Sequence, residues 1–122
     1  MTVLKTYQDL EVWKKSIDWL EMVYRVSQHF PPEERYGLTS QLRRAAASIP
    51  ENIAEGAARS GTGEYFQFLS VASGTLAEAE TFLILSVRLG PLKQEQATPL
   101  QEQADAIGRM LSGLKRSLRS MR

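Results

Sequence analysis

The stretch GLTSQLRRAAASIPENIAEGAARS, residues 37–60, decides the fold of this chain. Apolar and small residues recur in it at helical spacing, and its alanines form a narrow face that a second helix can approach closely. Pro50 interrupts the pattern, because a proline inside a helix has no N–H for the carbonyl of Ala46 and costs about 3 kcal/mol. The pattern resumes at once and stops at Gly56. One kinked helix over residues 39–55 is the preferred interpretation, and a boundary between two helices is the alternative.

Three further helices are expected around this stretch. They cover residues 9–29, the segment from the glycine loop at 59–64 to Leu89, and the segment from about Thr98 to the C-terminus. Pro31-Pro32 marks the end of the first of these helices. A cap at Ser60 or Thr62 marks the start of the next one, and Gly90 marks its end. Pro99, at a first helical position, marks the start of the last one. Short loops between long helices favour antiparallel neighbours. The predicted fold class is therefore all-α, an antiparallel up-and-down four-helix bundle.

Composition narrows the class of protein. Hydrophobic residues make up 43% and charged residues 24% of 122 residues, which is ordinary for a soluble globular chain, so we expect one domain over residues 1–122. The absence of cysteine excludes disulfides, thiolate metal sites and cysteine nucleophiles. We find no apolar run near the roughly 18 residues that span a bilayer and no signal peptide. The expectation is a cytoplasmic protein without a membrane contact.

Two of the expected helices carry more apolar surface than one core face requires. In the first helix the main stripe consists of Leu10, Trp13, Ile17, Leu20 and Tyr24. A second stripe on this helix and a wide apolar surface on the third helix supply the candidate subunit-interface residues Trp19, Val23, Phe30, Phe68 and Phe82. Large exposed apolar patches commonly mark interfaces, so we expect self-association. The alternative is that these side chains only widen the core.

Basic residues form two groups that could hold phosphate. The first group contains Arg43, Arg44 and Arg59, and its alternative role is to form ion pairs within the bundle. Arg43 and Arg44 point about 100° apart on a helix, so one can be structural while the other is exposed. The second group lies near the C-terminus, where no acidic residue follows Ala106, and consists of Arg109, Lys115, Arg116, Arg119 and Arg122. Its alternatives are a nucleic-acid or acidic-protein contact and a solvated face that complements the helix dipole.

Nothing in the sequence predicts a catalytic, cofactor-binding or metal-binding residue. Glu51 and Glu55 share a helix face but have no nucleophile or histidine nearby in the pattern. His29 is the only histidine, so neither a transition-metal site nor the Glu-x-x-His pattern of bundle metal centres is expected. The loop sequence GTGEYF lacks the lysine and preceding strand of a nucleotide-binding loop. We therefore expect a protein that is not an enzyme.

Four sequence blocks together resemble the 23S rRNA intervening-sequence proteins. They are DLEVW at 9–13, FPPEERYGLTSQLRRAA at 30–46, SIPENIAEG at 48–56 and the aromatic start of the segment EYFQFLSVASGTLAEAETFLILSVRLG at 64–90. The resemblance implies a four-helix bundle that assembles as a ring-like homopentamer and has no established catalytic activity. It also implies a relation to the accessory variability proteins of diversity-generating retroelements, whose basic pentameric barrels bind nucleic acid and a reverse transcriptase. This chain departs from those basic barrels in its near-neutral formal net charge of +1.

The function expected from these observations is a non-enzymatic, oligomeric helical-bundle scaffold or adaptor that binds RNA or DNA weakly through its basic patches. The alternative is a protein-interaction ring that binds an acidic protein partner without nucleic acid. Both hypotheses use the same cations, and they differ in the polymer that supplies the negative charge.

Overall fold

The computed structural model describes residues 6–121 as a bundle of four α-helices. The helices are α1 (Glu11–Ser27), α2 (Leu38–Ala58), α3 (Thr62–Leu89) and α4 (Gln94–Ser120), with short 3-10 turns η1 (Tyr7–Asp9) and η2 (Pro32–Glu34). No strand occurs in this described part of the chain. The predicted all-α fold class is confirmed.

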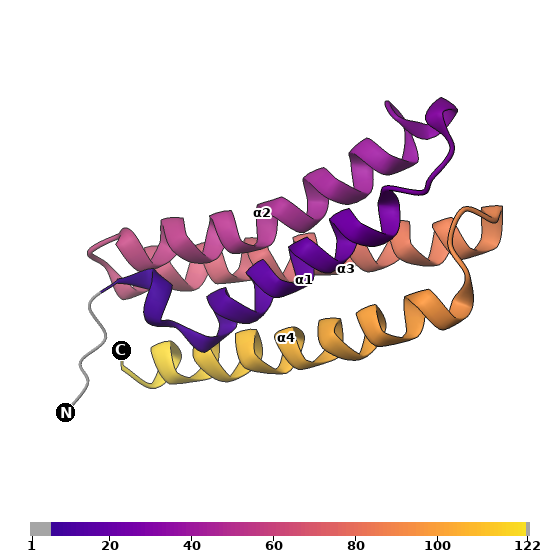
Figure 1. The fold of residues 1–122 in the computed structure, drawn as a ribbon. Helices are drawn as coiled ribbons and strands as arrows, with labels where there is room; N and C mark the ends of the chain where they lie inside the picture. The colour runs from indigo at the N-terminus through magenta and orange to yellow at the C-terminus, as the bar shows by residue number, and fades with distance from the viewer. Residues whose placement is uncertain (1–5, 122) are drawn as a thin grey trace.

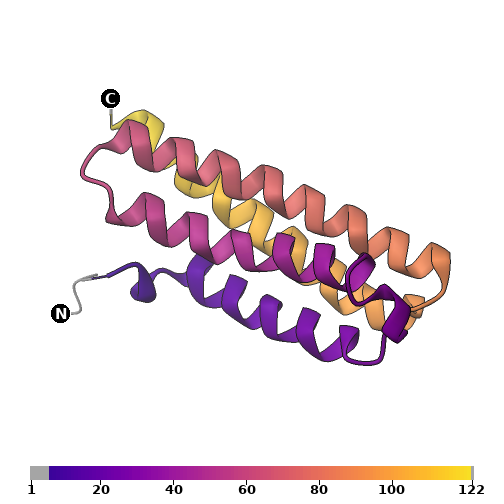
Figure 2. The same ribbon diagram turned by 90° about the horizontal axis from the view of Figure 1, so that it is seen from above.

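Consecutive helices run in opposite directions and surround one core (Figures 1 and 2). Each of α1 and α3 packs beside both α2 and α4, while the backbones of the diagonal pairs α1–α3 and α2–α4 do not come close together among the described residues. The start of α1 and the end of α4 lie at the same end of the bundle in both views. The most extensive contact joins α2 to α3, where Gly56 of α2 lies against Tyr65 and Phe68 of α3.

The ends of the helices differ in part from their predicted positions. Gly90 follows the end of α3 with a φ of 110°, in the left-handed region. Glycine adopts this conformation without strain because it has no Cβ. Neither predicted cap begins this helix, because Gly61 occupies the N-cap position and no side chain caps it. The start of α4 was also predicted too late: the helix begins at Gln94, so Pro99 lies inside it rather than at its first position. Gln96 Oε1 accepts a hydrogen bond from the Lys93 N–H at 3.0 Å, and this bond caps the helix at its observed start.

Helix α2 continues through Pro50, as the kinked-helix interpretation predicted. The proline is buried, and the helix bends along its length in Figure 1. The side-chain amide of Asn52 donates to Ser48 in the turn beside the missing bond, at 2.7 Å from the backbone oxygen and 3.0 Å from Oγ.

The core contains the second apolar stripe of α1, not the stripe that the sequence favoured. Trp19 and Val23 are 0% exposed and Phe30 is 7% exposed within the single chain. Trp19 also donates from Nε1 to the backbone oxygen of Leu100 in α4 at 2.8 Å, which satisfies its only polar atom. The prediction that Trp19, Val23 and Phe30 form a subunit interface is therefore wrong, because the chain's own helices already cover them.

This rotation of α1 leaves the predicted main stripe only partly covered, with Leu10 and Trp13 half-buried against the core. Ile17 and Leu20 are half-buried, and Tyr24 is 46% exposed. They line an apolar hollow of about 400 Å³ whose rim includes Glu21 and Arg25. The other two interface candidates, Phe68 and Phe82, are half-buried along α3 and stay predictions.

Candidate nucleic-acid interface

Arg43 holds the end of α1 against α2. Its Nε donates to Ser27 Oγ at 2.8 Å, and its Nη2 donates to the backbone oxygen of Tyr24 at 3.3 Å. The guanidinium carbon also lies 4.3 Å from the centre of the Tyr24 ring, which is within cation–π range. Ser27 is itself buried and donates to the Val23 carbonyl at 2.7 Å. These contacts engage most of the Arg43 side chain, so its structural role is the one that the geometry supports.

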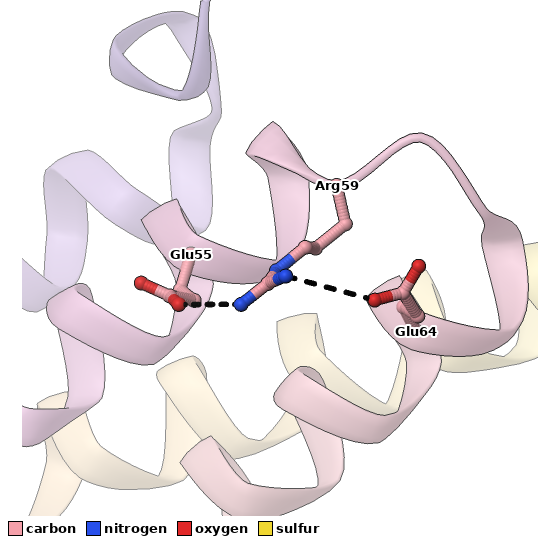
Figure 3. A network of polar contacts seen from close by, with 3 residues as sticks. All are labelled: Glu55, Arg59 and Glu64. Carbon is pink, nitrogen blue, oxygen red and sulfur yellow. Dashed lines mark hydrogen bonds and ion pairs between the residues drawn. The ribbon is translucent and has the colours of Figure 1, made fainter.

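Arg59 joins the end of α2 to the start of α3. Its Nη2 lies 2.8 Å from Glu55 Oε1 and its Nη1 lies 3.8 Å from Glu64 Oε2, as Figure 3 shows. Its guanidinium carbon lies 5.2 Å from the centre of the Phe68 ring. Each of these ion pairs is partly exposed and adds little stability alone. Together they occupy both ends of the guanidinium and close the α2–α3 loop.

Arg44 lies on the outer face of α2, apart from Arg43, as the helical spacing predicted. Its Nη2 donates to Gln41 Oε1 at 2.7 Å, and no ion pair within residues 6–121 includes it. The first basic group is therefore divided. Arg43 and Arg59 are bound by the chain's own groups, and the Arg44 guanidinium faces solvent.

Three cations in the last turns of α4 form a surface cluster. Lys115, Arg116 and Arg119, which we call the α4 basic cluster, line a hollow of about 220 Å³ together with Ser112. None of the three belongs to an ion pair in the described part of the chain. The Arg119 guanidinium carbon lies 5.1 Å from the centre of the Phe66 ring, which holds that side chain beside the start of α3. Arg122, the fifth member of the predicted group, lies outside the described residues.

A larger groove of about 610 Å³ runs from this cluster along the line between α3 and α4. Small residues, including Ser73, Ala77 and Gly108, lie along it. Beyond them it is lined by Glu80 and Asp105. Burial and, secondarily, the nearby Asp105 carboxylate raise the pKa of Glu80. The groove is thus basic at one end and acidic at the other.

Arg109 belongs to the acidic part of this groove. It lines the groove one helical turn after Asp105, with Glu80 on the facing helix. Two carboxylates beside it reduce its attraction for phosphate, because like charges repel. The structure therefore separates Arg109 from the α4 basic cluster, although the sequence placed them in one group. The acidic pair was not anticipated, since its members are far apart in the sequence and no local pattern connects them.

The described residues 6–121 also have to be considered for a metal site. Within residues 6–121, no three His, Asp or Glu side chains lie close enough to hold a metal ion. Glu55 is engaged by Arg59. His29 is exposed after the end of α1. The surface features that remain are the α4 basic cluster, the acidic end of the groove and the outer face of α3.

The outer face of α3 is unusually apolar. Of the helices in the described part of the chain, α3 alone is long and apolar enough to cross a membrane by length and composition, and 28% of the apolar window is buried. Glu78 and Glu80 interrupt the apolar run, so no stretch of this length was predicted from the sequence. The core helix of a bundle passes the same test of length and composition, so the property is weak evidence for a membrane.

Comparison with known proteins agrees with this fold. The family model described as 23S rRNA-intervening sequence protein matches residues 8–113. A crystal structure of a protein of unknown function from the S23 ribosomal protein family of Bacteroides thetaiotaomicron is similar, with a TM-score of 0.76 and 20% sequence identity. The match covers 85% of this chain and 97% of that one, and at this identity it shows the fold alone. No curated protein shows significant similarity to the chain.

Proposed function

The chain belongs to the 23S rRNA-intervening sequence protein family, and from this membership and the surface of α4 we propose a non-catalytic, self-assembling scaffold that binds RNA or DNA weakly. The proposed assembly is a ring-like homopentamer in the cytoplasm. One observation carries the nucleic-acid part of the proposal. Arg43 is bound by Ser27 and Tyr24, and Arg59 is paired with Glu55 and Glu64. The members of the α4 basic cluster, by contrast, take part in no ion pair within residues 6–121 and converge on one hollow.

The chemistry of this cluster suits phosphate. Arg116 and Arg119 offer guanidinium groups that donate hydrogen bonds to phosphate oxygens in pairs, and Lys115 adds a third positive charge. Such contacts are made to the phosphate backbone and do not distinguish one base from another, so we expect binding without strong sequence preference. A single cluster is small. Several copies in one assembly would act on the same strand and raise the overall affinity without any new contact.

A charge-reversal experiment tests this proposal. The Arg116→Glu/Arg119→Glu double variant should bind labelled single-stranded RNA and duplex DNA about tenfold or more weakly than the wild type in fluorescence anisotropy at low salt. The matched control is Lys14→Glu/Lys15→Glu, which reverses two exposed charges on α1. The control should bind nearly as well as the wild type, and circular dichroism checks that both variants are folded.

Two outcomes would contradict the proposal. Equal loss of binding in the two double variants would show that overall charge, not the α4 basic cluster, attracts the polymer. Wild-type protein that binds neither polymer at about 50 mM salt would remove nucleic acid as the ligand. An acidic protein would then be the better candidate for the same cluster.

A further inference from the structure

Helix α3 carries an apolar stripe on its surface in addition to the residues that it buries in the core. The members of this stripe fall at two positions of a seven-residue repeat, which keeps them on one side of the helix. Val71 is 45% exposed, Leu85 is 38% exposed and Leu89 is 63% exposed. Together with the half-buried Phe68 and Phe82 they form what we call the α3 stripe. In the described part of the chain α3 packs beside α2 and α4 only, so no further helix covers the exposed part of this stripe.

Helix α1 carries a surface stripe with the same spacing. Ile17, Leu20 and Tyr24, which we call the α1 stripe, lie three and four residues apart and line the apolar hollow of about 400 Å³. All three are at least partly exposed within the single chain. Helices whose apolar residues share a seven-residue repeat can pack together, because the side chains of one fit between those of the other. The two stripes are therefore suited to each other.

Both stripes lie on the sides of their helices that face α2. In α1, the centre of the Tyr24 ring lies 4.3 Å from the guanidinium carbon of Arg43, a residue of α2. In α3, Phe68 lies against Gly56 of α2, whereas Glu80 lines the groove towards α4. The stripes thus belong to the two neighbouring faces of the bundle that share α2, which we call the α1–α2 face and the α2–α3 face.

The orientation of these two faces is compatible with a ring. Neighbouring faces of a four-helix bundle point about 90° apart, and the two contact faces of a subunit in a closed ring of five diverge by about 108°. Rotation about an axis parallel to the bundle keeps the direction of every helix. Consecutive helices alternate in direction, so α1 and α3 run the same way within one chain. In a ring, α1 of one copy and α3 of the next copy are therefore parallel.

We propose that the α1–α2 face of one copy packs against the α2–α3 face of the next copy, with the α1 stripe in parallel contact with the α3 stripe. The inference rests on the self-assembly in the proposed function and names the two faces that perform it. The contact joins two different faces, so its repetition generates a ring when the rotation closes, whereas a face paired with itself would stop at a dimer. Helix α2 then lines the centre of the ring, and α4 lies on the outside with its basic cluster accessible.

The size and the charge of the two faces suit a second copy. A face two helices wide and as long as the 17 residues of α1 measures about 20 by 26 Å, or about 500 Å² in projection. This is of the order of the roughly 800 Å² of accessible surface that each partner buries in a specific interface. Glu78, in the repeat between Val71 and Phe82, is exposed and belongs to no ion pair within residues 6–121. Arg25, on the rim of the α1 hollow, supplies an exposed positive charge for it.

A pair of neighbouring substitutions tests the α3 stripe. Leu85→Glu places a carboxylate inside the contact, so this variant should need about tenfold more protein than the wild type, or more, to assemble. The matched control is Ile84→Glu. Ile84 is 47% exposed, but it lies four residues after Glu80 and so on the α4 side of the helix. The control should assemble like the wild type in light scattering across a micromolar dilution series, with circular dichroism as the check of folding.

Cysteine crosslinking tests which faces meet, since the chain contains no cysteine of its own. Tyr24→Cys places a thiol on the α1 stripe, and Leu85→Cys places one on the α3 stripe. When the two variants are co-expressed and treated with a short bis-maleimide, a crosslinked dimer should appear on a denaturing gel. Each variant alone should stay monomeric on the gel, because neither stripe contacts its own copy in a neighbour. The double variant in one chain should give a ladder that ends at the number of copies in the ring.

The outcomes separate this inference from the proposed function. Failure of the co-expressed variants to crosslink, or assembly of Leu85→Glu at the wild-type concentration, would overturn the contact while self-assembly stands. Crosslinked dimers of either cysteine variant alone would also overturn it, because each face would then pair with itself. So would equal loss of assembly in Ile84→Glu and Leu85→Glu, since the effect would not depend on the stripe. A wild type that is monomeric throughout the series would overturn both the contact and the oligomeric scaffold.

Discussion

At the scale of single residues, Gly56 sets the distance between α2 and α3. A Cβ at this position would lie 2.7 Å from the Phe68 Cβ and 3.1 Å from the Tyr65 Cδ1. The Phe68 Cβ is bonded directly to the backbone of α3, so it cannot move away unless the helix itself shifts. The glycine in SIPENIAEG is thus required by close packing of two helices, and the prediction that it ends the helix is wrong, because α2 continues to Ala58.

We expect Gly56→Ala to destabilise the protein by about 1–3 kcal/mol, because overpacking forces the two helices apart. The measurement is the free energy of unfolding from urea titrations. Gly74→Ala is the matched control: it lies within α3, and a Cβ there meets nothing within 4 Å. The control should be stabilised by about 0.5–1 kcal/mol, since alanine favours the helix over glycine. A Gly56 variant as stable as the wild type would contradict this account of the α2–α3 contact.

At the scale of the elements, the bend of α2 is attributed to Pro50. Alanine at this position restores an N–H for the Ala46 carbonyl and removes the ring that crowds it. We expect Pro50→Ala to fold with its helical content retained, but with a straighter α2 and an altered assembly. Circular dichroism, light scattering and a crystal structure of the variant measure these three properties.

The second proline within a helix is the control for that experiment. Pro99 lies inside α4 and is exposed, so Pro99→Ala should leave the assembly unchanged. A Pro50 variant with the same bend and the same assembly as the wild type would show that packing alone, and not the proline, bends α2.

The helices themselves could be predicted from the sequence, but the rotation of α1 could not. Apolar spacing and Gly90-Pro91 located α3 correctly, because these signals act within one segment. Both faces of α1 are apolar, so periodicity alone could not decide which one is buried. The choice depends on a contact far away in the sequence, the hydrogen bond from Trp19 Nε1 to the Leu100 oxygen in α4. This is why the interface assigned to Trp19 was wrong.

The same limit applies to the candidate site. Helical spacing was enough to bring Lys115, Arg116 and Arg119 together, since all three lie on one helix. It could not reveal that Arg43 is bound to Ser27 and Tyr24 across the α1–α2 contact. Nor could it show the two carboxylates beside Arg109, which come from different helices. Local patterns predicted local clusters, and the pairing of helices then decided which cations remain available.

At the scale of the whole molecule, the cations assigned to nucleic acid lie in the last turns of α4. Each copy in the proposed assembly adds one α4 basic cluster, so a modest cluster becomes a multivalent one.

The central claim is that the α4 basic cluster binds the phosphate backbone, and its most direct test is the salt dependence of duplex DNA binding. Release of counterions from three neutralised phosphates predicts a slope of about −3 in a plot of log affinity against log salt concentration, and a steeper one if several copies bind. Arg116→Glu/Arg119→Glu should show a much shallower slope. A wild-type slope near zero, or an equal slope in the variant, would contradict the claim.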